Sequence, residues 1–375
     1  MAFNSQSSGP SLPEKRVSHV AVTWNNAILI WGGRIPDNYD INTRSIIYYH
    51  KYGKWSRKET SGAVPPDCGP EAQVLEDKMF VPYLHRGNNI VIHFLDLQTW
   101  IWTRLTPGGT QPSSHIFGNT SWAHNGKIYS FGCGGPTGES PNQLVCYNIS
   151  TNSWEWPDTG GDTPQSRRNH LTIISDDTVF LFGGVSDRSP SDAYYCYNDL
   201  HILDMKHMIW KKVHDNISTV EGPDKEGMKT SRYTFTLLNQ STAVVIGMRY
   251  DIETKHFVDD CWLLNLRSAM QFNIPSSIWT KAAVNFARVY HAAILQPMSK
   301  RLWVIGGHNI HDSTADVVIL KINFGDQPSP LKYLAMDIVA RNVCAHDPRL
   351  VPDQLPEELS NEIEAYRCEL GEQNS

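Results

Sequence analysis

One module recurs six times along this chain of 375 residues, and it restricts the possible folds more than any other feature. Each copy has an alternating apolar strand, a two-residue turn and a second, almost continuously apolar strand that usually ends in glycine. The turns are 51, 49, 51, 64 and 59 residues apart, at Asn25-Asn26, Glu76-Asp77, Asn125-Gly126, Asp176-Asp177, Gln240-Ser241 and Ser299-Lys300. A strand repeat with a period of about fifty residues is typical of propellers. The sequence therefore predicts an all-β, six-bladed propeller.

The first copy shows how one blade is expected to form. It divides into strands at residues 17–23, 27–31, 45–50 and 54–59, and Gly32-Gly33 follows the second strand. Most units then carry a tryptophan, and an indole at this spacing is expected to pack between neighbouring blades. These tryptophans are Trp55, Trp102, Trp154, Trp210 and Trp279. Polar insertions at residues 187–198 and 218–230 are expected to be long loops around one face of the ring.

Composition limits the class of partner. The formal net charge of −6 argues against a nucleic-acid or anionic-membrane ligand. No window of eighteen apolar residues occurs, and residues 1–13 are polar, so we expect a flexible N-terminus and neither a membrane span nor a signal peptide. The seven cysteines form no Cys-x-x-Cys pair, which indicates free thiols in a reducing compartment. A cytoplasmic or nuclear location is expected.

Arginine recurs ahead of the first strand in several units, in a stretch that we call the lead-in segment. Examples are Arg16-Val-Ser-His19 and Arg167-Arg-Asn-His170. The residue after the glycine pair is expected to emerge at the same end of the propeller. Guanidinium groups bind carboxylates in a bidentate way, so we predict a pocket there for an acidic side chain or a chain terminus. The predicted peptide-binding residues are Arg16, Arg34, Arg167, Arg232, Tyr233, Arg249, Arg288 and His308.

A structural alternative stays open for these residues. The arginines would then tie neighbouring blades together by bonding carbonyl groups or aspartates. The histidines of the lead-in segments are expected to be structural.

Catalytic motifs are missing from the sequence. There is no Gly-x-Ser-x-Gly elbow, phosphate-binding loop or dinucleotide fingerprint. His308-Asn-Ile-His311 offers two imidazoles but no obvious third ligand, so a propeller enzyme with a metal at its mouth is kept only as an alternative. We expect a non-catalytic protein without metal or cofactor.

The glycine pair, the aromatic residues and the following tryptophan together resemble the kelch repeat. The resemblance covers most of the chain, and the propeller domain is predicted at residues 14–327. Kelch propellers serve enzymes, scaffolds and receptors alike, so this resemblance implies the fold but no single function.

The strand pattern stops near residue 324, and two helices are predicted within residues 328–367, followed by a polar tail at 368–375. The first helix would carry an apolar stripe of Leu331, Leu334, Ala335, Ile338 and Val339. The second would begin near Leu355-Pro356-Glu-Glu-Leu359. A pair of helices packed back on the propeller is one account, and docking into a partner's groove is the other.

The C-terminal segment also resembles known partner-binding boxes. Pro330-Leu331-Lys-Tyr-Leu-Ala335-Met-Asp-Ile-Val339 resembles the elongin-C-binding box, and Leu355-Pro356-Glu-Glu-Leu359 resembles the cullin-2 box. Their order after a kelch propeller is similar to the kelch-domain-containing substrate receptors of cullin-2 RING ubiquitin ligases. The resemblance implies elongin B/C and cullin-2 as partners, and a pocket that captures substrate C-termini. A kelch scaffold for cytoskeletal or signalling proteins is the alternative.

Two positions depart from the receptor pattern. Val185 stands where receptors for diglycine ends carry an arginine, and Tyr233 stands where a serine hydroxyl would reach the carboxylate.

Overall fold

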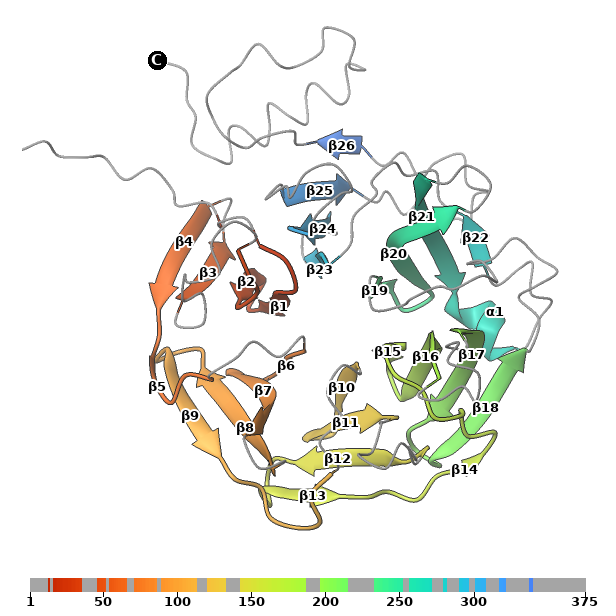
Figure 1. The fold of residues 1–375 in the computed structure, drawn as a ribbon, viewed down its shortest axis with the longest axis horizontal. Coiled ribbons are helices and arrows are strands. Elements are labelled where there is room, and N and C mark those ends of the chain that lie inside the picture. The colour runs from red at the N-terminus through yellow and green to blue at the C-terminus, as the bar shows by residue number, and fades with distance from the viewer. Residues whose placement is uncertain are drawn as a thin grey trace, which may run out of the picture.

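The strands of this protein surround a central opening (Figure 1). The structure is a computed structural model, and it describes residues 13, 16–35, 46–51, 54–65, 71–85, 89–112, 120–132, 142–186, 196–214, 233–251, 256–271, 279–281, 290–296, 301–307, 317–321 and 337–339. Within these residues the strands form six sheets of four or five strands. The prediction of an all-β propeller is confirmed.

The N-terminal half of the chain forms the first three sheets. Sheet 1 has the order β1-β2-β3-β4, with β1 (Val20–Trp24), β2 (Ala27–Trp31), β3 (Ile46–Lys51) and β4 (Lys54–Glu59). Sheet 2 has the order β5-β9-β8-β7-β6, with β5 (Ser61–Gly62), β6 (Gln73–Leu75), β7 (Lys78–His85), β8 (Asn89–Asp96) and β9 (Ile101–Leu105). Sheet 3 has the order β10-β11-β12-β13, with β10 (Ser121–His124), β11 (Lys127–Phe131), β12 (Leu144–Asn148) and β13 (Ser153–Glu155).

The C-terminal half forms the other three sheets. Sheet 4 has the order β14-β18-β17-β16-β15, with β14 (Gly160–Gly161), β15 (Leu171–Ser175), β16 (Thr178–Val185), β17 (Cys196–Asp204) and β18 (Ile209–His214). Sheet 5 has the order β19-β20-β21-β22, with β19 (Thr234–Asn239), β20 (Thr242–Asp251), β21 (His256–Asn265), the short helix α1 (Leu266–Met270) and β22 (Trp279–Lys281). Sheet 6 has the order β23-β24-β25-β26, with β23 (Ala292–Gln296), β24 (Arg301–Ile305), β25 (Val317–Lys321) and β26 (Asp337–Val339).

The innermost strands contact one another in a closed cycle, β1–β6–β10–β15–β19–β23–β1. Contacts between the first and last sheets close this cycle. The Gly307 amide donates a hydrogen bond to the Arg16 carbonyl at 3.0 Å, and the Ser18 amide donates to the Tyr290 carbonyl at 3.0 Å. The side chain of Gln296 donates to the Asn26 carbonyl at 3.0 Å. The ring is therefore sealed by the lead-in segment and by the first turn of the chain.

The repeat predicts the hairpins of the ring well. The predicted two-residue turns are present from Asn25-Asn26 to Gln240-Ser241, whereas Ser299-Lys300 lies outside the described residues. In sheet 1, Trp24 pairs with Ala27 across the turn, and β2 is fully buried. The continuous apolar run of β2 follows from its place, because strands cover both of its edges and neighbouring sheets cover both of its faces.

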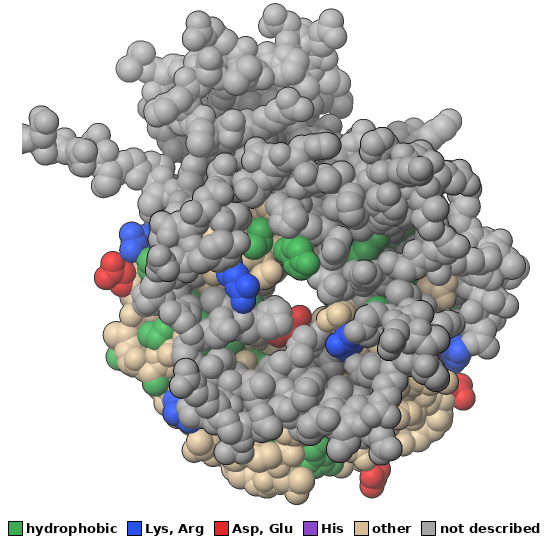
Figure 2. Space-filling view, viewed as in Figure 1, with side chains coloured by type: hydrophobic (Ala, Val, Ile, Leu, Met, Phe, Trp, Pro, Cys, Tyr) green, Lys and Arg blue, Asp and Glu red, His purple; other side chains and the backbone are tan. Residues whose placement is uncertain are grey.

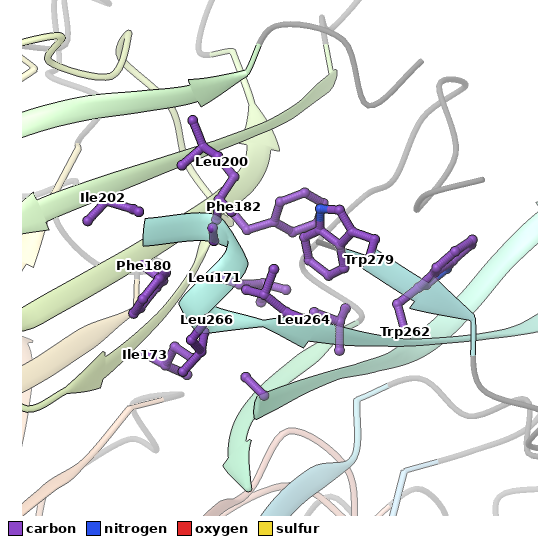
Figure 3. Close-up of a cluster of buried hydrophobic side chains, with 14 of the residues drawn as sticks. Leu171, Ile173, Phe180, Phe182, Leu200, Ile202, Trp262, Leu264, Leu266 and Trp279 are labelled. Atoms are coloured by element: carbon purple, nitrogen blue, oxygen red, sulfur yellow. The ribbon is translucent and has the colours of Figure 1, made fainter. Parts of the chain in front are cut away.

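Aromatic side chains on the outer strands join each sheet to the one before it. The pairs, with their ring-centroid distances, are Trp55–Trp303 at 6.1 Å, Trp102–Trp31 at 5.1 Å, Trp210–Phe131 at 5.1 Å and Trp279–Phe182 at 4.8 Å. Trp154 of sheet 3 packs in one cluster with Phe80 of sheet 2. Figure 3 shows such a cluster between sheets 4 and 5, where Trp279 lies against Phe182. The prediction that these indoles pack between blades is confirmed.

The predicted C-terminal helix is wrong at residues 337–339, which form β26. This strand pairs with β25 in antiparallel register, Leu320 opposite Ile338 and Ile319 opposite Val339. The last sheet thus takes its outer strand from a segment beyond residue 327. Leu331, Leu334, Ala335, Leu355, Pro356 and Leu359 lie outside the described residues.

The predicted loop at residues 187–198 is wrong at its end, because β17 already begins at Cys196. Residues 187–195 and the insertion at 218–230 lie outside the described residues. Among the helices of the described part, none has the length and apolar character needed to cross a membrane.

Candidate functional site

Hydrogen bonds bring the lead-in segments and the residues after the glycine pairs together at one end of the ring. In sheet 1, Val17 and Arg34 exchange two backbone hydrogen bonds of 2.9 Å. In sheet 4, Arg168 and Val185 exchange the same two bonds, also at 2.9 Å. We call this end the mouth end. Figure 2 looks onto one face of the ring and shows the central channel open, with basic side chains beside it.

Glycine allows the two segments to come this close. Gly33 has a φ of 79°, and a Cβ on it would lie 2.7 Å from the Cβ of His19 and 2.8 Å from the carbonyl oxygen of Val17. Gly184 has a φ of 104° and a similar relation to Arg168 and His170. A larger residue would separate the lead-in segment from the strand end, since real Cβ atoms do not approach other atoms this closely.

Arg16 and Arg167 occupy equivalent positions, and each binds its own sheet. Nη1 of Arg16 donates to the carbonyl of Gly32 at 3.0 Å, and Nη1 of Arg167 donates to the carbonyl of Gly183 at 3.0 Å. Both side chains are buried. These contacts are the ones that the structural alternative expected. Peptide binding by these two residues stays a prediction.

Arg167 forms a bidentate ion pair with Asp199 in addition. Nη2 donates to Oδ2 of Asp199 at 3.0 Å, and Nη1 bonds the other carboxylate oxygen. Nε donates to the Gln165 carbonyl at 3.0 Å, and the guanidinium carbon lies 4.0 Å from the centre of the Tyr197 ring. Burial alone would raise the pKa of Asp199, but the hydrogen bonds and charge of Arg167 bring it below its ordinary value.

A cavity of about 770 Å³ opens at the mouth end of sheet 4. Its walls come from the segment after β14, the lead-in segment of β15, and strands β17 and β18. The lining residues are Asp162, Thr163, Gln165, Arg167, Tyr197, Asn198, Asp199, His201, Lys212 and Val213. We call it the sheet-4 cavity. Its size suits a few side chains of a bound peptide.

Arg34 differs from the two buried arginines, because it is exposed at the mouth end while its backbone is held by Val17. The other predicted site residues lie elsewhere or are not described. Tyr233 is buried, and its ring packs against Gly247, where an added Cβ would lie 2.2 Å from the ring. Arg249 lies in β20, paired with Val258, and its side chain is outside the described part. Arg232, Arg288 and His308 lie outside the described residues.

The lead-in histidines are buried between sheets. Burial, and then the charges of Arg16 and His291, lower the pKa of His19 to about 3. Burial and the charge of Arg167 lower the pKa of His170 to about 3. His291 shares a 2.9 Å hydrogen bond with the hydroxyl of Thr234 in the neighbouring sheet. Neutral, enclosed imidazoles are consistent with the structural role that the sequence predicts for them.

Sequence reasoning missed Tyr197, Asp199 and His201. These residues alternate along β17 with Leu200 and Ile202, which face the cluster between sheets 4 and 5. The polar-apolar alternation from Asp199 to Ile202 was the available signal, since successive residues of a strand face opposite sides. In the part of the chain that the structure describes, no group of three or more His, Cys, Asp or Glu residues could hold a metal ion.

Comparisons with known proteins agree with this geometry. The model of the KLHDC2/KLHL20/DRC7 Kelch-repeats domain matches residues 18–227. Kelch domain-containing protein 10 from Homo sapiens is 22% identical over 332 residues, which cover 83% of this chain and 70% of that protein. Kelch domain-containing protein 2 from Bos taurus is 26% identical over 237 residues, 54% of this chain and 57% of that protein. A solved structure of YjhT covers 84% of the chain with a TM-score of 0.57 at 14% identity, a likeness of fold alone.

Proposed function

This chain belongs to the KLHDC2/KLHL20/DRC7 Kelch-repeats domain family, and we propose that it is a non-catalytic interaction protein that holds a peptide of a partner at its mouth end. The homologues support a kelch protein-interaction function. The single observation that carries the peptide site is the position of Arg34. Its backbone is fixed by two hydrogen bonds to Val17, yet its side chain is exposed beside the lead-in segment.

A carboxylate is the ligand that suits Arg34 best. A guanidinium group offers two parallel N–H donors to the two carboxylate oxygens, and a hydrogen bond to a charged group contributes about 1.5–3 kcal/mol. Arg167 suits this role less, because Asp199 already takes up its charge. The carboxylate of an acidic side chain or of a protein C-terminus would therefore bind at Arg34 rather than inside the sheet-4 cavity.

A screen of random peptides tests this site directly. Peptides that end in a free carboxylate are compared with the same peptides ending in an amide, using the purified full chain. We expect a subset of sequences to bind, and amidation or removal of their acidic side chains to weaken binding about tenfold or more. A library from which no carboxylate-dependent binder emerges would contradict the proposal.

A role as substrate receptor of a cullin-2 RING ligase is the finer form of this proposal. It rests on the resemblance of the C-terminal boxes, with Leu331, Leu334, Ala335, Ile338 and Val339 contacting elongin C and Leu355, Pro356 and Leu359 contacting cullin-2. Bound substrate would then be held near the ubiquitin-conjugating enzyme, which raises the effective concentration of its lysines. Such a complex would act in the cytoplasm or nucleus.

The pairing of β26 adds a condition to this role. Ile338 and Val339 are engaged with β25, so an elongin partner that takes these residues as a helix must first displace the strand. Co-purification of elongin B and C with the chain, and its loss in Leu331→Arg with the fold intact, would support the receptor role. Failure of the wild-type chain to recruit elongin would instead favour a cytoskeletal or signalling scaffold.

A further inference from the structure

The outer edges of sheets 2, 3 and 4 are covered by the chain segment that leads in from the preceding sheet. In sheets 2 and 4 this segment contains the short strand β5 or β14, which pairs in parallel with β9 or β18 (Figure 1). In sheet 3, Gly108 forms a parallel bridge with Ser153 of β13. We call residues 61–63, 108–109 and 160–162 the edge-cover segments.

The three edge-cover segments share a sequence pattern. Each has a glycine with positive φ beside the outer-strand tryptophan, and a buried proline three residues later. The glycines are Gly62, Gly109 and Gly161, with φ of 84°, 82° and 81°, and the prolines are Pro65, Pro112 and Pro164. A Cβ on any of these glycines would clash with the carbonyl oxygen of the tryptophan beside it, so the position requires glycine.

The outer edge of sheet 1 is not paired with any described residue. β4 is the last strand of this sheet, and its Trp55 corresponds to the outer-strand tryptophans of the other three sheets. The segments that lead into sheets 5 and 6, at residues 215–232 and 282–289, lie outside the described residues. An uncovered strand edge promotes pairing with other chains, and proteins normally cover such edges. The edge of β4 is therefore a docking surface for one more short strand.

The N-terminal residues of the chain carry the pattern of the edge-cover segments. Pro13 is buried and lies three residues before Arg16, which is the same spacing as between Pro164 and Arg167. Gly9 precedes Pro13 by four residues, one more than in the other segments. The segment before Pro13 thus corresponds in sequence to the segments that cover sheets 2, 3 and 4.

We propose that residues 8–10 form a short strand parallel to β4, with Gly9 opposite Trp55. Pro10 is compatible with this place, because an edge strand tolerates a residue without an amide N–H. The segment is attached to the lead-in segment of sheet 1, so its effective concentration at this edge exceeds that of a strand from a second molecule. This inference does not depend on the peptide site at Arg34.

The amide of Trp55 reports on this pairing. In sheet 3, the Trp154 amide donates to the carbonyl of Gly108 at 2.9 Å, and the equivalent acceptor for Trp55 is the carbonyl of Ser8. Hydrogen exchange of the tryptophan backbone amides is measured by NMR on the ¹⁵N-tryptophan-labelled full chain and on a chain that begins at Leu12. We expect the Trp55 amide to exchange at least about tenfold faster in the shortened chain, and the Trp154 amide to be unchanged.

Two results of this measurement overturn the inference. Equal protection of the Trp55 amide in both chains would mean that another segment, or a second copy of the chain, covers β4. Fast exchange of this amide in the full chain would mean that the edge is open.

A point variant tests the same contact without shortening the chain. Gly9→Val places a β-branched side chain where the pattern requires a positive φ, and Ser5→Val is the matched control outside the proposed strand. Gly9→Val should speed exchange of the Trp55 amide about tenfold, whereas Ser5→Val should leave it as in wild type. Unchanged protection in Gly9→Val overturns the placement of Gly9 against β4. Binding of carboxylate peptides should persist in both variants, so failure here would leave the proposed function standing.

Discussion

Trp102 in β9 packs against Trp31 in β2, with ring centroids 5.1 Å apart and ring planes inclined at 48°. Both side chains are at most 2% exposed, although the residues belong to different sheets. The same relation recurs around the ring between an outer-strand aromatic residue and the preceding sheet. The repeat therefore encodes the packing contacts between sheets as well as the sheets themselves.

Replacing Trp102 by Ala should destabilise the protein by about 3–5 kcal/mol, because the cavity left behind spans two sheets. The neighbouring Ile101 provides a matched control, since its side chain is 46% exposed. Ile101→Ala should change the free energy of unfolding by less than about 0.5 kcal/mol. Urea denaturation measures both values. An equal loss of unfolding free energy in the two variants would contradict the conclusion that the Trp102 indole holds the two sheets together.

Gly33→Ala should destabilise the chain more than Gly126→Ala. Both glycines have positive φ, 79° and 71°, so both variants carry the backbone strain of about 1–2 kcal/mol. Only Gly33 also has Val17 and His19 within 3 Å of an added Cβ, whereas nothing lies within 4 Å of one at Gly126. Thermal unfolding of the two variants compares them. A larger loss at Gly126 would show that the close approach of the lead-in segment is unimportant.

Asp199→Asn should cost about 3 kcal/mol or more at neutral pH, because it leaves the Arg167 guanidinium buried without its counter-ion. Asp162→Asn, at the exposed rim of the same cavity, should change stability by less than about 0.5 kcal/mol. Urea denaturation at neutral pH measures both.

The pKa of Asp199 is lowered in the folded state, so its contribution is present above the unfolded pKa of about 3.9 and is lost as pH falls through the folded value. The difference between wild type and Asp199→Asn should therefore shrink on acidification below about pH 4. A pH-independent difference would contradict the assignment of this stability to the ion pair.

A chain ended after residue 336 should lose protection at β25, because β26 no longer covers its edge. Hydrogen–deuterium exchange of residues 317–321 should be faster in this variant than in a chain ended after residue 345, which keeps the pairing of Ile319 with Val339. Identical exchange in the two chains would mean that residues 337–339 do not act as a strand in solution.

Local patterns predict much of this fold. The two-residue turns and the Gly-rich strand ends place the hairpins, as in β1 and β2, because turn chemistry and apolar alternation are encoded within a few residues. The tryptophan spacing also predicts the packing between sheets. Long-range pairing was not predictable in the same way. Ile338 and Val339 fit a helical stripe equally well, and only their distant partners Leu320 and Ile319 make them a strand.

The candidate site shows the same limit. The lead-in arginines could be found as a recurring residue type, but their partners could not. Asp199 lies 32 residues after Arg167 in sequence, and the lead-in motif contains no sign of it. His201 is likewise identifiable only when the fold places it inside the sheet-4 cavity.

Charge reversal at Arg34 tests the central claim most directly. The affinity of a selected carboxylate-bearing peptide is measured for wild type, Arg34→Glu and the control Arg57→Glu, an exposed arginine in β4. We predict that Arg34→Glu weakens binding at least about tenfold with an unchanged melting temperature, and that Arg57→Glu binds like wild type. Equal affinities in all three proteins would contradict a peptide site at the mouth end.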